Sequence, residues 1–233
     1  MSTVLAVSDL SSGYGGSTVL RHVSLSIAPG AIVALVGKNG MGKTSLLKTI
    51  MGFLPARGGC VMLDGRDITR LPPHRRRAFA IAYAPQERAL FQDLSVHDNL
   101  RLGLPADAAF ETALADVAGA FPFLKTRLRQ RAGTLSGGEQ KMLIVARGLM
   151  ACPRVFLLDE VTEGLQPSIV DRLAEVLAEA RRAHGMAMLV VEQHIPFVLG
   201  LADSYAVLDR GEIGATGPID AAAREIIDQH IRL

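Results

Sequence analysis

The segment from Gly37 to Thr44 combines glycines, a lysine and a hydroxyl side chain at a spacing that suits phosphate binding. It matches G-x-x-x-x-G-K-[ST], a pattern in which the N–H groups of a glycine loop and of the following helix surround a polyphosphate. In that pattern Lys43 reaches the β- and γ-phosphates, and the Thr44 hydroxyl holds Mg²⁺. The apolar run Ala31–Val36 precedes the loop, and a helical pattern, Lys43–Met51, follows it. This strand–loop–helix context predicts binding of ATP with Mg²⁺.

Two adjacent carboxylates follow a second apolar run. Val155–Leu158 is typical of a strand buried on both faces, and Asp159 and Glu160 stand at its end. Adjacent carboxylates repel each other, so their presence beside a phosphate loop indicates a function. We expect Asp159 to hold Mg²⁺ through water, and Glu160 to orient or deprotonate the water that attacks the γ-phosphate. The two motifs together predict ATP hydrolysis.

A second glycine turn, Ser136-Gly137-Gly138, opens a helix that is predicted over Lys141–Met150. This turn supplies another set of N–H donors at a helix N-terminus. One nucleotide does not need two such cradles. The second cradle makes sense if it serves a nucleotide that is bound to another subunit.

A sheet must position these motifs. Ala31–Val36, Val155–Leu158 and Met186–Val191 are short apolar runs, each followed by a polar or glycine-rich turn. Such runs are typical of parallel strands that helices cover on both faces, so the predicted fold class is α/β. A helix with apolar residues at helical spacing is predicted from Ser168 to Ala183, with Ser168 as its N-cap.

The remaining segments have other patterns. Val4–Leu10 and Val19–Ile27 alternate in part, as half-buried antiparallel strands do. The dipeptides Asp64-Gly65 and Arg210-Gly211, each between strand-like runs, predict two hairpins. The stretch from about 88 to 133 contains helix-like pieces and no strong strand. We therefore expect a mainly helical subdomain inserted into the α/β core.

The composition limits the class of protein. A formal net charge of +2 argues against a dedicated nucleic-acid binder. The basic run His74–Arg77 is expected to be a solvated helix face, in preference to a phosphate or lipid contact. Cys60 and Cys152 are expected to be buried, reduced thiols of a cytosolic protein. We find no signal peptide and no apolar run near the ~20 residues of a membrane span, so a role at a membrane would require a membrane partner.

The string Leu-Ser-Gly-Gly-Glu-Gln at 135–140 resembles the signature of the ATP-binding cassette (ABC) family, and the resemblance covers essentially the whole chain. It implies a P-loop NTPase core with a mainly parallel sheet, an antiparallel β subdomain and an inserted helical subdomain. The whole of 1–233 would be a single ABC ATPase domain, with 1–87 and 134–233 as the core and 88–133 as the insert. The resemblance also implies that two subunits pair head to tail, each signature closing on the other's ATP.

The resemblance assigns roles to further residues. Gln86 is similar to the glutamine that senses Mg²⁺ and faces the transmembrane partner. Tyr14 is similar to the aromatic residue that stacks on adenine, and its alternative role is that of a turn tyrosine. The implied catalytic residues are Glu160, Lys43 and either Gln193 or His194. The implied metal ligands are Thr44, Gln86 and Asp159. The implied nucleotide contacts are Tyr14, Gly37, Lys38, Asn39, Gly40, Met41, Gly42, Lys43, Thr44, Ser45, Gln86, Ser136, Gly137 and Gly138.

Several positions depart from the common family pattern. Val161 follows the glutamate where proline is usual, and Gln166 stands where aspartate is usual. The switch histidine is expected two residues after a strand, where this chain has Gln193, with His194 one position later. We favour Gln193 as the γ-phosphate contact because of its register. Either side chain can donate a hydrogen bond, but only histidine can also carry a positive charge.

These departures narrow the resemblance to the ATPases of branched-chain amino acid importers and the similar urea and short-chain amide importers. They imply a bacterial or archaeal importer in which two ATPases, identical or paralogous, bind two permeases at the cytoplasmic face of the membrane. A solute-binding protein would act on the outer side, and no nucleic-acid partner is expected. Two alternatives stay open: a soluble ABC ATPase in a non-transport process, and a regulatory nucleotide-binding subunit with little activity.

Overall fold

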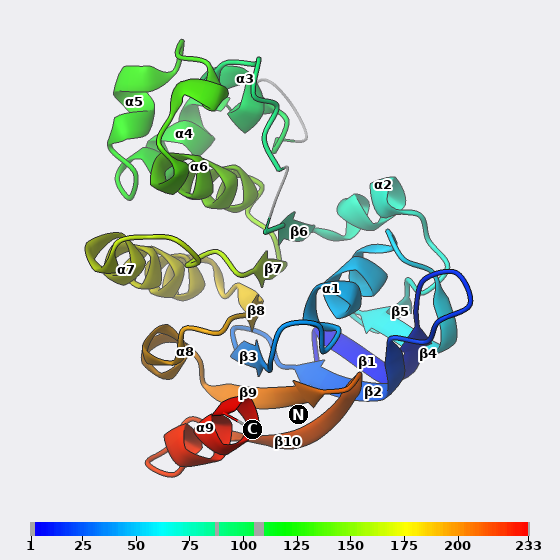
Figure 1. The fold of residues 1–233 in the computed structure, drawn as a ribbon. Helices are drawn as coiled ribbons and strands as arrows, with labels where there is room; N and C mark the ends of the chain where they lie inside the picture. Colours follow the sequence, from blue (N-terminus) through cyan, green and yellow to red (C-terminus); the bar gives the residue numbers. More distant parts are fainter. Residues whose placement is uncertain (1–2, 87–88, 105–109, 233) are drawn as a thin grey trace.

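The computed structural model describes residues 3–86, 89–104 and 110–232, which form two sheets with helices packed around them (Figure 1). In spatial order the larger sheet consists of β10 (Glu212–Pro218), β9 (Ser204–Asp209), β3 (Ile32–Val36), β8 (Ala187–Val191), β7 (Val155–Asp159) and β6 (Ile81–Ala84). All neighbouring strands are parallel except β9 and β10. The mainly parallel sheet is thus confirmed. The sequence did not reveal β6, which is short and only partly buried.

The second sheet is antiparallel throughout. In spatial order it consists of β2 (Leu20–Ile27), β1 (Leu5–Ser12), β4 (Ala56–Leu63) and β5 (Arg66–Asp67). The predicted antiparallel β subdomain is confirmed, as are both hairpins. Asp64 and Gly65 join β4 to β5, and Arg210 and Gly211 join β9 to β10, all four with positive φ. Positive φ at both turn residues provides the twist that a two-residue hairpin needs.

The helices lie beside the large sheet and in the segment between β6 and β7. They are α1 (Lys43–Met51), α2 (Pro73–Arg76), α3 (Val96–Arg101), α4 (Phe110–Ala118), α5 (Phe123–Arg127), α6 (Gly137–Met150), α7 (Pro167–His184), α8 (Ile195–Leu201) and α9 (Ala223–Arg232). In Figure 1 α3, α4, α5 and α6 gather in one helical lobe. α3, α4 and α5 lie within the stretch predicted as the helical insert, whereas α6 lies in the part that the prediction assigned to the core. The limits of the insert at 88 and 133 stay a prediction, and Arg88 lies outside the described residues.

The three central strands are buried on both faces. Every residue of β3, β7 and β8 is buried, as their continuous apolar runs predict. Successive side chains of a strand point to opposite faces. Accordingly, Leu157 packs in the core that includes α1 and β1, whereas Phe156 and Leu158 pack in the core that includes α6 and α7. Because both faces are covered, the strands are fixed relative to one another. No helix in the described ranges is long and apolar enough to cross a membrane.

One predicted helix start is wrong. α7 begins at Pro167 with Gln166 as its N-cap, so Ser168 lies within the first turn and does not cap the helix. Proline suits the first helical position because its φ is already helical and its missing N–H would have no partner there. Gln166 makes no side-chain capping bond. Proline geometry therefore sets this start in place of a hydroxyl cap.

The basic run His74–Arg77 is not solvated at every position, contrary to the prediction. Arg76 on α2 is only 2% exposed. Its guanidinium donates to the carbonyls of Thr49 and Ile50 in the last turn of α1 and to two carbonyls that precede α2. The last carbonyls of a helix lack partners within the helix and carry partial negative charge, which a buried cation satisfies. Arg76 thereby fastens α2 to the helix that follows the phosphate loop.

The two cysteines are free thiols. The sequence predicted that both would be buried, and this prediction is wrong for both. Cys60 is half-buried because β4 leaves alternate side chains partly exposed. Cys152 is exposed in the turn after α6, where its φ of 42° directs the chain away from the helix. Neither thiol contributes to the apolar layers of the sheet.

Replacement of Arg76 by methionine should destabilise the fold. Arg76→Met leaves buried carbonyls without donors, so we expect the free energy of unfolding to fall by about 3 kcal/mol. Urea denaturation followed by circular dichroism measures this change. The control is Arg75→Met at the exposed neighbouring position, with an expected change of less than about 0.5 kcal/mol. Equal effects of the two substitutions would show that the buried hydrogen bonds are not the cause.

Candidate functional site

Four loops meet at one edge of the large sheet. β3, β8, β7 and β6 are parallel neighbours, so their carboxyl ends lie side by side. The register keeps these ends level, since Leu35 pairs with Val191 and Val191 pairs with Asp159. Ligands of open parallel sheets bind outside the carboxyl ends of the strands. The predicted site residues, which are far apart in the sequence, thereby come together.

The loop after β3 turns sharply into α1. Gly37 has a φ of 154° and lies so close to Leu208 that a Cβ would stand 2.2 Å from its carbonyl oxygen. Gly42 has a φ of 103° and is the N-cap of α1. A side chain at either position would strain the turn. The N-terminus of α1 therefore opens directly from the loop, and helix N-termini favour anions.

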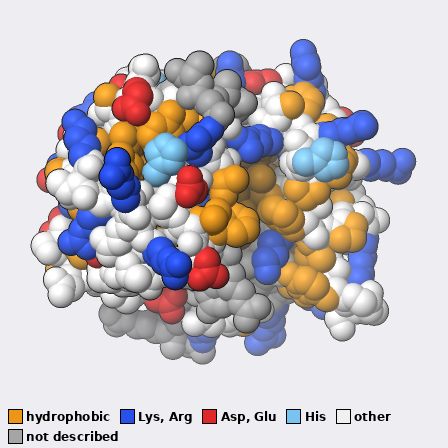
Figure 2. Space-filling view, turned by 90° about the horizontal axis from the view of Figure 1, so that it is seen from above, with side chains coloured by type: hydrophobic (Ala, Val, Ile, Leu, Met, Phe, Trp, Pro, Cys, Tyr) orange, Lys and Arg blue, Asp and Glu red, His pale blue; other side chains and the backbone are white. Residues whose placement is uncertain are grey.

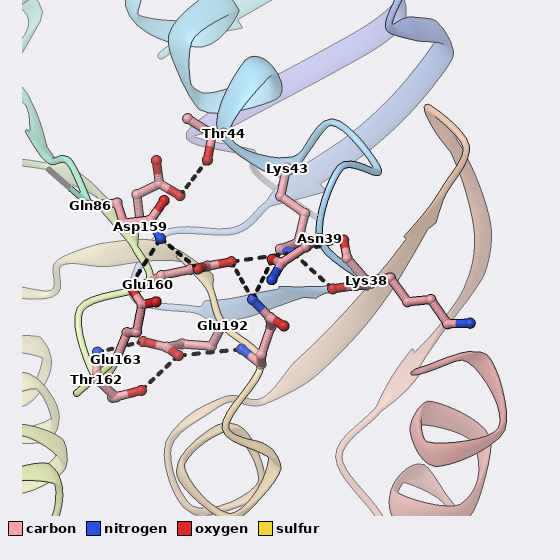
Figure 3. A network of polar contacts seen from close by, with 12 residues as sticks. Lys38, Asn39, Lys43, Thr44, Gln86, Asp159, Glu160, Thr162, Glu163 and Glu192 are labelled. Carbon is pink, nitrogen blue, oxygen red and sulfur yellow. Dashed lines mark hydrogen bonds and ion pairs between the residues drawn. The ribbon is translucent and has the colours of Figure 1, made fainter. Parts of the chain in front are cut away.

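The Lys43 side chain lies inside this loop and is 4% exposed. Its ammonium donates to the carbonyls of Gly37 and Lys38 over 2.8 and 3.0 Å. Nζ also lies 3.3 Å from Oε1 of Glu160 (Figure 3). A buried ion pair needs additional hydrogen bonds to offset its desolvation, and the two carbonyls supply them. The ammonium is thus held by oxygen atoms that phosphate oxygens can replace.

Asp159 is fully buried, and both of its carboxylate oxygens accept hydrogen bonds. Thr44 Oγ1 donates to Oδ1 over 3.0 Å, and the Tyr83 hydroxyl donates to Oδ2 over 2.9 Å. Burial raises the pKa of Asp159, and these two hydrogen bonds oppose the rise. Burial also raises the pKa of Tyr83, so its hydroxyl stays a donor. The structure brings Thr44 and Asp159 together as predicted, whereas the sequence missed Tyr83 because it missed β6.

The carboxylate of Glu160 is the centre of the network in Figure 3. It is 6% exposed and accepts from three separate loops. Besides the Lys43 contact, Gln86 Nε2 donates to Oε2 over 2.9 Å, and Gln193 Nε2 donates to Oε1 over 2.8 Å. Gln193 Nε2 also donates to Asn39 Oδ1 over 2.7 Å, which connects the loop after β8 to the phosphate loop. The residues that contact the Glu160 carboxylate, namely Lys43, Gln86 and Gln193, and also Asn39, are all predicted site residues.

The two candidates for the switch position occupy different surroundings. Gln193 belongs to the network, whereas His194 is the exposed N-cap of α8. Within the described residues the His194 side chain has no hydrogen bond or ion pair. The geometry therefore favours Gln193, the residue that the register predicted.

Two residues near Glu160 were not predicted from the sequence. Glu192 is 2% exposed, and its carboxylate accepts from Thr162 N over 2.9 Å and from Thr162 Oγ1 over 2.7 Å. Burial raises the pKa of Glu192, and the hydrogen bonds from Thr162 oppose the rise. Lys141 of α6 donates to the backbone carbonyl of Glu160 over 3.1 Å. The sequence offers only weak evidence for a role of either residue, namely that each is next to a predicted motif. Glu192 directly precedes Gln193, and Lys141 directly follows the signature string.

The second glycine turn lies at the N-terminus of α6. Ser136 caps this helix in a capping box with Glu139, in which Ser136 Oγ accepts from Glu139 N and the Glu139 carboxylate accepts from Ser136 N. Ser136 and Gly137 are exposed, and Gly138 is half-buried. No hydrogen bond or ion pair in the described ranges joins this turn to the phosphate loop. The structure therefore does not bring these two predicted elements together within one chain.

The other predicted nucleotide contacts lie around the loop. Gly40 has a φ of 82°, and Ser45 is buried in α1. The Met41 carbonyl accepts from the N–H at 211, and in Figure 3 the Lys38 side chain points away from the network. Tyr14 is 49% exposed in the turn between β1 and β2.

The chemistry of these side chains fits a nucleoside triphosphate with Mg²⁺. The Lys43 ammonium and the helix N-terminus are suited to phosphate groups. The Thr44 hydroxyl and the Asp159 carboxylate, with oxygens 3.0 Å apart, are the kind of ligand that Mg²⁺ prefers. Glu160 is the carboxylate nearest to Lys43 in this network, where a general base for an attacking water would be needed.

Comparison with known families agrees with this site. The sequence pattern of the family described as ABC transporter matches residues 20–163, which include the phosphate loop, the second glycine turn and Glu160. The chain belongs to the ABC transporter family. It is therefore an ATP-binding subunit of the kind that hydrolyses ATP, and such subunits work with membrane permease components.

Individual relatives of this ABC protein are similar over nearly their full lengths. BraG of Pseudomonas aeruginosa, a high-affinity branched-chain amino acid transport ATP-binding protein, is 38% identical over 90% of this chain and 91% of its own. LivF of Archaeoglobus fulgidus, a probable branched-chain amino acid transport ATP-binding protein, is 36% identical over 92% of each chain. LptB of Escherichia coli K12, a lipopolysaccharide export system ATP-binding protein, is 33% identical over 98% of this chain and 95% of its own.

The fold of this ABC protein also matches solved structures. A nucleotide-free ATP-binding cassette from an ABC transporter superposes with a TM-score of 0.88 over 97% of this chain and 96% of that chain. Because the two sequences are only 24% identical, this match concerns the fold. The α/β class with a parallel and an antiparallel sheet is thereby confirmed.

The neighbours Gln193 and His194 provide a matched pair of variants. Gln193→Ala removes donors to Glu160 and Asn39, so we expect kcat for ATP hydrolysis to fall about tenfold or more. His194→Ala should leave kcat within about twofold, since its side chain lies outside the network. Steady-state phosphate release at saturating ATP measures both. The reverse order of effects would assign the switch position to His194.

Proposed function

We propose that this ABC ATPase drives an importer of branched-chain amino acids or related small polar solutes. The observation that carries the proposal is the similarity to BraG and LivF over nearly the whole of all three chains. The presence of Gln193, and not a histidine, among the donors to Glu160 supports it, because this departure marks the resemblance to that importer branch. Both the inward direction of transport and the identity of the solute are part of what we propose.

The chain's own side chains account for hydrolysis of the substrate ATP. Lys43 would exchange its loop carbonyls and Glu160 for the β- and γ-phosphate oxygens. Thr44 and Asp159 would hold Mg²⁺, which supplies neutralising charge for the phosphates. Once released from the ammonium, the Glu160 carboxylate would orient the attacking water and accept its proton. Gln193 would then donate to the reacting phosphate, and Tyr14 would stack on the adenine.

The site is proposed to be completed by a second ATPase subunit. Ser136 and Gly137 are exposed and make no contact with the phosphate loop of the same chain. In a C₂ pair the same surface serves both partners, so each Ser136–Gly138 turn would close on the ATP of the other. The second subunit is identical or a paralogue.

A permease would bind at the face shown in Figure 2. Hydrophobic side chains gather there between the helical lobe and the lobe of α1 and α2. The exposed large apolar residues include Phe53 after α1 and Phe91, Leu94 and Leu102 around α3. The Phe53 ring lies 6.3 Å from that of Tyr83, whose strand leads to Gln86. Binding at this surface, on the cytoplasmic face of the membrane, would connect a permease to Gln86, with a solute-binding protein on the outer side.

Glu160→Gln should separate nucleotide binding from turnover. The amide keeps the shape of the side chain but cannot accept a proton, so we expect the Kd for ATP to stay within about threefold and kcat to fall at least about a hundredfold. Nucleotide binding and phosphate release measure the two quantities. The control is Glu179→Gln on the exposed face of α7, for which both should match the unmodified protein. Near-normal hydrolysis by Glu160→Gln would remove Glu160 from the mechanism.

Transport itself tests the solute and the direction. The chain is produced in its host together with the membrane proteins that copurify with it, and the purified complex is placed in vesicles with the solute-binding protein. Uptake of labelled leucine, valine, urea and short amides is then measured. We expect ATP-dependent uptake of branched-chain amino acids that Glu160→Gln abolishes. Extraction of lipopolysaccharide would favour the alternative suggested by similarity to LptB. ATPase activity that nucleic acid stimulates, without a membrane partner, would favour a soluble non-transport ATPase.

A further inference from the structure

The backbone of Glu160 adopts the left-handed conformation, with a φ of 48°. For a residue with a Cβ this conformation costs about 1–2 kcal/mol, and it persists only where neighbouring groups hold it. One set of groups comes from the end of β8. The Val191 carbonyl accepts from Glu160 N over 2.9 Å, and the Glu192 carboxylate accepts from Thr162. The turn that aims Glu160 is therefore held on its β8 side.

The other side of the turn is held by Lys141 of α6. Its ammonium donates to the carbonyl of Glu160 and to the carbonyl of Glu163, three residues later. Nζ also lies 3.9 Å from the Glu163 carboxylate, and the Lys141 side chain is only 20% exposed. Burial lowers the pKa of Lys141, and the neighbouring carboxylates of Glu163, Glu192 and Glu160 oppose this. One cation thus joins the two ends of the turn.

We propose that Lys141 is a positioning residue for ATP hydrolysis, which holds the Glu160 turn in its left-handed conformation and ties it to α6. The same helix begins at the Ser136 cap, five residues before Lys141. The ammonium therefore connects the turn that aims Glu160 to the element that is proposed to meet the partner's ATP. The inference rests on the proposed role of Glu160 as the base for the attacking water.

The first test replaces only the ammonium. Lys141→Met keeps the aliphatic stem, so we expect kcat for ATP hydrolysis to fall about ten- to a hundredfold, because the base is no longer held in position. The Kd for ATP should stay within about twofold, since the phosphate loop is unchanged. Lys141→Arg, which restores donors to the carbonyls, should recover much of kcat. Lys125→Met, at an exposed position on α5, is the matched control and should keep normal kcat.

The second test asks whether Lys141 acts through Glu160. If it does, adding Lys141→Met to Glu160→Gln causes no further loss of the residual single-turnover rate, which is measured with labelled ATP. Losses that multiply in the double variant would overturn the inference, as would normal kcat or parallel loss of ATP affinity in Lys141→Met alone. Circular dichroism and thermal unfolding of each variant exclude loss of fold as the cause. Normal hydrolysis by Glu160→Gln would instead refute the role of Glu160 itself.

Discussion

The hydrogen bonds to the Glu160 carboxylate are the interaction on which the rest of the site depends. An almost fully buried carboxylate is costly unless other groups compensate its charge. Here Lys43, Gln86 and Gln193 do so, and each comes from a loop that follows a different strand. This arrangement requires β3, β6, β7 and β8 to end at the same level. The apolar layers on both faces of the sheet enforce that requirement.

The same network allows nucleotide to bind without leaving the Glu160 carboxylate or the Lys43 ammonium buried and unpaired. Two of the three donors to Glu160, Gln86 and Gln193, are neutral amides that can rotate toward other acceptors. The third, Lys43, is also held by two backbone carbonyls. Phosphate oxygens can replace all of the oxygens that surround its ammonium. In the proposed mechanism, binding of ATP would exchange one set of partners for another and would leave the Glu160 carboxylate free to act as the base.

The glycine turn at Ser136 lies outside the network around Glu160. The turn at Ser136 is fully organised by its capping box, yet it faces solvent and has no part in the phosphate loop of its own chain. An exposed helix N-terminus, held in shape by the capping box, supports the proposed role toward the nucleotide of a second subunit. Lys141 and Glu192 hold the turn that contains Glu160 in place, Lys141 from α6 and Glu192 from the end of β8. The proposed base is thus positioned both by α6 and by the end of β8.

Local patterns were enough to predict much of this protein. The phosphate loop, the buried strands, both hairpins and the pair Asp159 and Glu160 were predicted because each depends on neighbouring residues and on a short period of burial. The start of α7 failed, since a proline at the first helical position was a stronger signal than a hydroxyl one residue later.

Tertiary structure alone decided the remaining features. It buried Arg76 within a basic run, brought the Tyr83 hydroxyl to Asp159 and placed the Lys141 ammonium on the Glu160 carbonyl. It also brought Glu192 to Thr162, two residues after Glu160. These outcomes depend on which strands and helices are neighbours and on the level at which they end. A short stretch of sequence does not determine which strands and helices become neighbours or at what level they end. They follow from packing both faces of one sheet, which is a property of the whole chain.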